Sequence, residues 1–129
     1  MSAIRKIRVL IVEDSMVNQK LLVGLLAEDP DFEVIGIVSN GAEAVEFVAG
    51  NKPDVISMDI NMPVMDGYEA MRIIRKTPGI QNTPIICLTA KAMKEDHENA
   101  LSNGANDYLS KPLNEDKLFA MLKIWLYKK

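Results

Sequence analysis

The sequence has few of the features that mark disulfide-linked, membrane-spanning or nucleic-acid-binding proteins. Cys87 is the only cysteine among 129 residues, so no internal disulfide can form and nothing requires an oxidising compartment. No apolar run approaches the roughly 20 residues that a membrane-spanning helix needs, and the amino-terminal residues show no secretory cleavage pattern. The net charge of −3 disfavours binding to a phosphate backbone, which requires a basic face. We therefore expect a cytoplasmic protein that binds neither membranes nor nucleic acids directly.

What remains is the composition of an ordinary folded domain. Hydrophobic residues make up 48% of the chain and charged residues 26%, close to the averages for globular proteins. A length of 129 residues fits one domain with one ordinary core. The chain stops just after the last predicted helix, so we expect a single domain over residues 1–129 with no output domain.

Five short apolar runs alternate with longer amphipathic segments. Their valine and isoleucine content favours strands, and most are too short to be helices. Their apolarity is continuous rather than alternating, which is typical of strands buried on both faces of a parallel sheet. The predicted strands are Ile7–Val12, Glu33–Val38, Asp54–Met58, Pro84–Leu88 and Asn106–Leu109.

The segments between these strands have helical patterns and recognisable ends. Ser15 is the predicted N-cap of the first helix, which Asp29-Pro30 stops. Its predicted apolar stripe consists of Val17, Leu21, Leu22, Leu25 and Leu26. Asp66-Gly67 opens the third helix, and Gly104 closes the fourth. The sequence therefore predicts five consecutive strand–helix units, which form a parallel sheet with right-handed crossovers.

Polar residues gather at the carboxyl ends of the predicted strands. Glu13 and Asp14 follow the first strand, Asp59 the third, Thr89 the fourth and Lys111 the fifth. In an open parallel sheet these ends form the ligand crevice, which is deepest where the strand order reverses. In a sheet of order 2-1-3-4-5 that reversal would bring the three acidic residues together.

Three carboxylates in one crevice require a positive partner. Hard oxygen ligands without usable histidine or cysteine suit Mg²⁺. Lys111 supplies a second, fixed positive charge, and Thr89 offers a hydroxyl donor. Such a site suits a phosphoryl group, and a carboxylate can itself accept that group to form an aspartyl phosphate.

Four motifs resemble those of bacterial response-regulator receiver domains. They are Val9–Ser15 (VLIVEDS), Met58–Gly67 (MDINMPVMDG), Leu88–Ala90 (LTA) and Gly104–Pro112 (GANDYLSKP). The resemblance covers nearly the whole chain, with the motifs in the family's order. It implies a flavodoxin-like (βα)5 fold, a three-layer sandwich around a parallel five-stranded sheet of order 2-1-3-4-5.

The resemblance also implies how a metal would be held. Asp59 would be the phosphorylated residue and would bind Mg²⁺ together with Asp14. The backbone carbonyl of Asn61 would add a ligand. The family often has Asp-Asp where this chain has Glu13-Asp14, so Glu13 would lie nearby or act through water.

The same resemblance implies a switch and not an enzyme. Thr89 would bond a phosphoryl oxygen, and Lys111 would pair with Asp59 and then with the phosphate. Movement of Thr89 would let the Tyr108 ring turn inward and reshape the surface of the fourth helix, fifth strand and fifth helix. The phosphoryl donor would be a histidine kinase or a histidine phosphotransfer protein, and a downstream protein would bind the reshaped surface.

Within the family, the two halves of the chain resemble different members. Residues 28–36 are similar to the receivers of chemotaxis methylesterases. Leu88–Met93 and the early Asn18-Gln19 are more similar to receivers attached to hybrid histidine kinases. Whether the chain is a free regulator or part of a larger protein stays open.

Two other functions share the fold class. A phosphatase of the haloacid dehalogenase type requires a second aspartate as acid–base catalyst, where this chain has Asn61. A dinucleotide-binding domain requires a glycine-rich turn after the first strand. That turn contains Glu13 and Asp14 and no glycine, so both alternatives are disfavoured.

Overall fold

Strands and helices alternate along the chain in the computed structural model, which describes residues 6–60, 65–89, 94–111 and 114–127. Both ends of every predicted strand are confirmed to within one residue. The elements are β1 Ile7–Val12, α1 Met16–Ala27, β2 Phe32–Val38, α2 Gly41–Gly50, β3 Val55–Asp59, α3 Gly67–Ile74, β4 Ile85–Thr89, α4 Lys94–Ser102, β5 Asp107–Ser110 and α5 Glu115–Tyr127.

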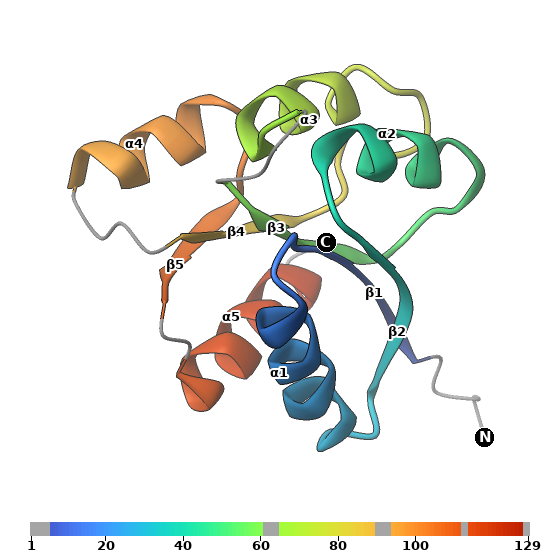
Figure 1. The fold of residues 1–129 in the computed structure, drawn as a ribbon, viewed down its shortest axis with the longest axis vertical. Helices are drawn as coiled ribbons and strands as arrows, with labels where there is room; N and C mark the ends of the chain where they lie inside the picture. Colours follow the sequence, from blue (N-terminus) through green and yellow to red (C-terminus); the bar gives the residue numbers. More distant parts are fainter. Residues whose placement is uncertain (1–5, 61–64, 90–93, 112–113, 128–129) are drawn as a thin grey trace.

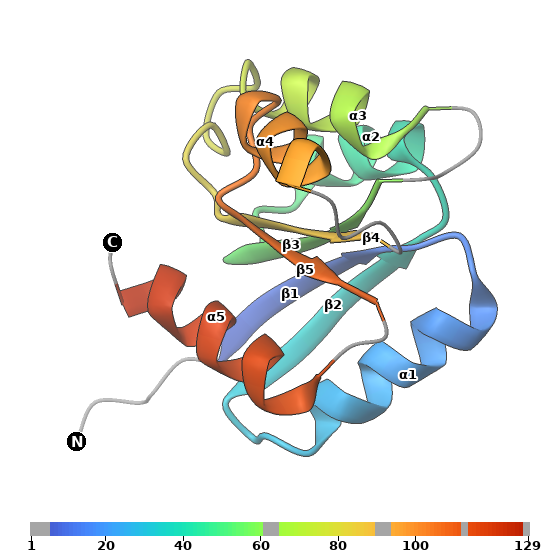
Figure 2. The same cartoon turned by 90° about the vertical axis from the view of Figure 1, so that its left-hand side faces the viewer.

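The strands form one parallel sheet in the order β2-β1-β3-β4-β5. Helices α2, α3 and α4 cover one face of this sheet, and α1 and α5 cover the other (Figures 1 and 2). The predicted three-layer, flavodoxin-like (βα)5 sandwich is therefore confirmed. The strand order reverses between β1 and β3, so the crevice expected for this topology lies at their carboxyl ends.

Each central strand contributes to two separate cores. In β1, Leu10 and Val12 belong to the core beneath α2 and α3, whereas Val9 and Ile11 belong to the core beneath α1 and α5. Successive side chains of a strand point to opposite faces, so a strand covered on both sides must be apolar throughout. Cys87 of β4 lies in the first core, where burial raises its pKa to about 12 and keeps the thiol protonated.

Helix α1 begins as predicted but buries less of its apolar surface. The Ser15 side chain accepts a hydrogen bond from the backbone N–H of Asn18, as an N-cap does. Leu22 and Leu26, one turn apart, are buried against the sheet. Val17 and Leu21 of the predicted stripe are 76% and 47% exposed, because they do not share that side of the helix.

Arg75, just after α3, ties together two loops at the amino-terminal edge of the sheet. Its guanidinium donates to the carbonyl oxygens of Gly104 (2.7 and 3.0 Å), Gln81 (2.9 Å) and Thr83 (2.6 Å). It also donates to Asn106 Oδ1 at 2.6 Å. All five N–H groups are thus used, which a planar guanidinium can do and a lysine ammonium cannot.

We therefore predict that Arg75→Lys lowers the free energy of unfolding by about 2 kcal/mol, because several partly buried acceptors lose charged donors. Chemical denaturation measures the change. The matched control is Arg72→Lys, since Arg72 is exposed and bonds Asn103 Oδ1. It should stay within about 0.5 kcal/mol of the wild type. Equal losses in both variants would contradict the role assigned to Arg75.

Candidate functional site

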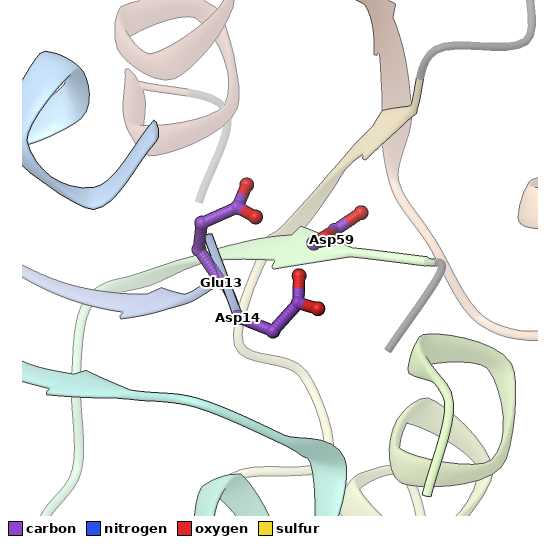
Figure 3. A group of neighbouring side chains, drawn as sticks. All are labelled: Glu13, Asp14 and Asp59. Atoms are coloured by element: carbon purple, nitrogen blue, oxygen red, sulfur yellow. The ribbon is translucent and has the colours of Figure 1, made fainter. Parts of the chain in front are cut away.

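The register of the central strands places the predicted acidic residues side by side. Val12, the last residue of β1, is paired with Met58 of β3. Glu13 and Asp14 therefore leave β1 beside Asp59, which ends β3. Figure 3 shows the three side chains at these strand ends, with Glu13 and Asp14 directed to different sides of the chain.

The three carboxylates form one cluster of mixed exposure. Each contributes an oxygen, and these oxygens all lie within 4.8 Å of one another. Glu13 and Asp59 are buried, at 1% and 4% exposure, whereas Asp14 is exposed. Negative charges this close repel one another, and burial weakens their screening by water. The cluster is therefore suited to hold a cation with a preference for carboxylate oxygens, such as Mg²⁺.

Lys111 brings an ammonium group to the cluster from the end of β5. Its backbone N–H donates to the carbonyl of Thr89 at 2.7 Å, which fixes the start of the side chain. The ammonium Nζ lies 2.8 Å from Glu13 Oε1 and 3.7 Å from Asp59 Oδ1. The resemblance implied pairing with Asp59, and the structure has that ion pair at 3.7 Å together with a shorter hydrogen bond to Glu13.

Thr89 is buried at 2% exposure at the end of β4, where its residue pairs with Ser110 of β5. The neighbouring pair in the sheet is Asp59 with Leu88, so Thr89 lies one residue beyond the level of the acidic side chain. Its hydroxyl is thus on the strand adjacent to Asp59, as the sequence predicted. Asn61 lies outside the described residues.

Tyr108 is already buried in this structure. Its side chain is 9% exposed, and its ring stacks on His97 of α4 with centroids 5.1 Å apart and an interplanar angle of 16°. Burial raises the pKa of its hydroxyl, and the charge of Asp96 adds to the effect. That hydroxyl has no hydrogen-bond partner within the part of the chain that the structure describes.

Gly67 has a role at the site that the sequence analysis did not assign. It begins α3, after Asp66, whose side chain accepts from the Glu69 N–H as an N-cap. A Cβ on Gly67 would lie 2.6 Å from the Asp59 carbonyl oxygen and 2.9 Å from Ile60 Cα. The backbone N–H of Gly67 donates a hydrogen bond to the carbonyl oxygen of Ile60 at 3.0 Å. The missing side chain thus lets α3 start against the strand end that bears Asp59. The sequence feature that could have indicated this role is a glycine at the start of a predicted helix.

Comparisons with known proteins agree on one family. Residues 9–123 match the family model of the response regulator receiver domain. The chain is 47% identical over 111 residues to a protein-glutamate methylesterase/protein-glutamine glutaminase of Nocardioides sp., covering 84% of this chain and 30% of that protein. It is 40% identical over 114 residues to the signal transduction histidine-protein kinase BarA of Escherichia coli K12, covering 88% of this chain and 12% of the kinase.

A solved structure extends the agreement to three dimensions. The receiver domain of the sensor histidine kinase PA1611 from Pseudomonas aeruginosa has a TM-score of 0.86 and 39% identity, covering 94% of this chain and 98% of that one. That structure has a magnesium ion coordinated in its active-site cleft. Both protein classes that the sequence resembles are thus among its relatives, and the chain spans less than a third of either curated protein. Across the described ranges, none of the helices has the length and apolarity to cross a membrane.

The crowding of the carboxylates leads to a prediction for Asp14. Asp14→Ala should weaken Mg²⁺ binding at least about tenfold, since one of the three carboxylates of the cluster is removed. Without metal the variant should be as stable as the wild type or slightly more stable, because repulsion is relieved. Calorimetric titration and thermal unfolding with and without Mg²⁺ measure both effects. Asp31→Asn, exposed at the opposite edge of the sheet, is the control. Unchanged Mg²⁺ affinity in Asp14→Ala would refute the assignment.

Proposed function

The chain belongs to the response regulator receiver domains, the phosphoryl-accepting domains of two-component signalling, and from this premise we propose that Asp59 is the acceptor. The observation that carries the proposal is the position of Asp59. It ends the central strand β3, beside two further carboxylates and with the Lys111 ammonium 3.7 Å from its Oδ1. Negative charge to hold a metal and positive charge to meet a phosphoryl group are thus both adjacent to it.

In the proposed reaction an oxygen of the Asp59 carboxylate attacks the phosphorus atom of a phosphohistidine. The new O–P bond gives an acyl phosphate, while the N–P bond breaks and its electron pair stays on the imidazole. Negative charge spreads over the phosphoryl oxygens during this transfer. We expect Lys111 and the Thr89 hydroxyl to meet that charge, which the 3.7 Å distance from Lys111 Nζ to Asp59 Oδ1 and the position of Thr89 on the adjacent strand support.

Asp14 and Asp59 are the residues that we expect to bind Mg²⁺. Glu13 adds negative charge nearby, and the Asn61 carbonyl, outside the described residues, stays a predicted ligand. The oxygen-only donor set fits the preference of this ion, and the Pseudomonas aeruginosa relative holds magnesium in its cleft. A bound Mg²⁺ would neutralise charge on the phosphoryl oxygens.

This part of the protein is proposed to act as a switch and not as a turnover enzyme. The methylesterase relative is much longer than the segment that matches this chain, so its esterase activity is not carried over. The relationship to BarA supports a histidine kinase or histidine phosphotransfer protein as the phosphoryl donor. A haloacid-dehalogenase-type phosphatase stays disfavoured, because Asn61 stands where that chemistry needs an acid.

The proposed output surface is formed by α4, β5 and α5, and Tyr108 lies within it. The ring is buried and stacks on His97 of α4, so it connects β5 to the helix of this surface. A phosphoryl group that draws Thr89 towards Asp59 would favour the buried ring if it binds that state better. Such couplings are typically about 1–3 kcal/mol, enough to change how a downstream protein binds this surface.

We predict that Asp59→Asn abolishes labelling by a phosphohistidine donor and by acetyl phosphate, because the amide is not a nucleophile. Radiolabelled donor or intact-protein mass spectrometry measures the label. Asp66→Asn is the matched control, since Asn caps a helix as well as Asp, and it should still accept label. Label that persists in Asp59→Asn would place the acceptor on another side chain.

A second prediction distinguishes modification of Asp59 from the conformational change that follows it. Thr89→Ala should still be modified at Asp59 by the phosphate mimic beryllofluoride but should lose most of the resulting backbone NMR shifts around Tyr108. The reason is that the hydroxyl linking the two positions is removed. Thr83→Ala, two residues before β4 begins, should keep the wild-type shifts. If Thr89→Ala also kept them, the hydroxyl would not be the link.

A further inference from the structure

We propose that Gly41, the first residue of α2, is a positioning residue for the end of β3 that carries Asp59. It holds the connection between Asp59 and α3 in place through a backbone contact that a side chain at residue 41 would disturb. This inference rests on the proposed function, because it explains how a residue without a ligating group affects the reactivity of the acceptor.

The amino terminus of α2 is itself held in place. Asn40 Oδ1 accepts from the N–H of Glu43 at 2.9 Å, and Glu43 Oε1 accepts from the N–H of Ser39 at 2.7 Å, which together form a reciprocal helix cap. Just before this cap, the carbonyl of Val38 accepts from the N–H of Glu13 at 3.0 Å. The first turn of α2 is therefore anchored at the carboxyl edge of the sheet.

Gly41 bonds the loop between β3 and α3 from this anchored position. Its N–H donates to the carbonyl oxygen of Met65 at 2.9 Å. The first N–H groups of a helix have no partner within the helix, and here Met65 supplies one. Because Asp66 caps α3 and Gly67 begins it, the contact joins the start of α2 to the start of α3. The two helices lie side by side on one face of the sheet (Figure 1).

Met65 is connected to Asp59 by a short series of backbone contacts. Gly67, two residues after Met65, donates its N–H to the carbonyl of Ile60 at 3.0 Å. A Cβ on Gly67 would lie 2.6 Å from the Asp59 carbonyl oxygen, so α3 starts against the backbone of the proposed acceptor. We therefore expect a displacement of Met65 to move Gly67 and, with it, the backbone of Asp59.

The contact between Gly41 and Met65 leaves no room for a side chain. A Cβ at residue 41 would lie 2.6 Å from the Met65 carbonyl oxygen, 2.9 Å from Met65 Cγ and 3.0 Å from Ala70 Cβ. Non-bonded heavy atoms normally keep a separation of roughly 3.5 Å, so an alanine would displace the Met65 carbonyl by about 1 Å. That carbonyl belongs to the backbone, so a change of side-chain rotamer cannot relieve the clash.

The test compares wild type with three glycine variants of the full chain, under conditions in which each is fully folded. In Gly41→Ala, labelling of Asp59 by acetyl phosphate at saturating Mg²⁺ should slow about tenfold, as expected for a displacement of about 1 Å near a reacting group. The backbone NMR signals of Ile60 and Gly67 should shift in the same variant.

Two variants serve as matched controls. A Cβ at Gly36 would also lie 2.6 Å from another atom, but that atom belongs to the Phe47 ring on the far side of α2 from Met65. Gly36→Ala should lower the midpoint of thermal unfolding and still label within about twofold of the wild-type rate. A Cβ at Gly50, the last residue of α2, would meet nothing within 4 Å, so Gly50→Ala should match the wild type in labelling.

A measurement on the wild type keeps the proposal testable if Gly41→Ala does not fold. Adding Mg²⁺ and the phosphate mimic beryllofluoride should slow hydrogen exchange of the Gly41 amide more than that of the Gly50 amide in the same helix. The reason is that the acceptor of the Gly41 N–H, Met65, is connected to the occupied site. Equal effects on the two amides would contradict the proposal.

Two further results would overturn it. One is labelling of Gly41→Ala within about twofold of the wild-type rate. The other is an equal slowing in Gly41→Ala and Gly36→Ala, which would assign the effect to lost stability alone. Failure of the proposed function looks different: wild type would then take no label on Asp59, whereas the signals of Ile60 and Gly67 would still report whether residue 41 positions the backbone there.

Discussion

The repulsion among three carboxylates at the carboxyl edge of the sheet is the constraint on which the site depends. Two of them, Glu13 and Asp59, are buried, and buried charges are costly unless they are paired. Lys111 supplies the pairing from 98 residues away along the chain. The parallel order of the strands brings these residues to one edge of the sheet. The charge balance of the site therefore depends on the sheet topology.

Much of this could be predicted from the sequence, because the signals are local. Continuous apolar runs predicted the strands, because a strand buried on both faces must be apolar at every position. Leu10 and Ile11, which are adjacent in β1, lie in opposite cores. Polar residues directly after those runs marked the site. Once the strand order was inferred, the meeting of Glu13, Asp14 and Asp59 followed from geometry alone.

The remaining features depend on distances that no pattern encodes. The sequence does not show whether Lys111 lies closer to Glu13 or to Asp59, whereas the structure places its Nζ 2.8 Å from Glu13 Oε1 and 3.7 Å from Asp59 Oδ1. The role of Gly67 arises from a contact with the backbone of Asp59, which is invisible until α3 is docked. Likewise, Val17 fits a helical apolar stripe but lies off the side that the sheet covers.

The two ends of the parallel strands differ in how completely their charged groups are paired. At the amino-terminal edge, all donors of Arg75 are satisfied by two loops. At the carboxyl edge the acidic charge exceeds what Lys111 can balance, so a bound cation or phosphoryl group changes the local energy strongly.

The path from that edge to the proposed output surface is short and lies on β5. The Lys111 N–H donates to the Thr89 carbonyl, so the residue that we propose to meet the phosphoryl charge is bonded to the strand that carries the Thr89 hydroxyl. Tyr108, three residues earlier on β5, pairs with Cys87 of β4 and stacks on His97 of α4. These contacts connect Thr89 of β4 and Tyr108 of β5 to His97 of α4, the elements through which we propose that phosphorylation is read out.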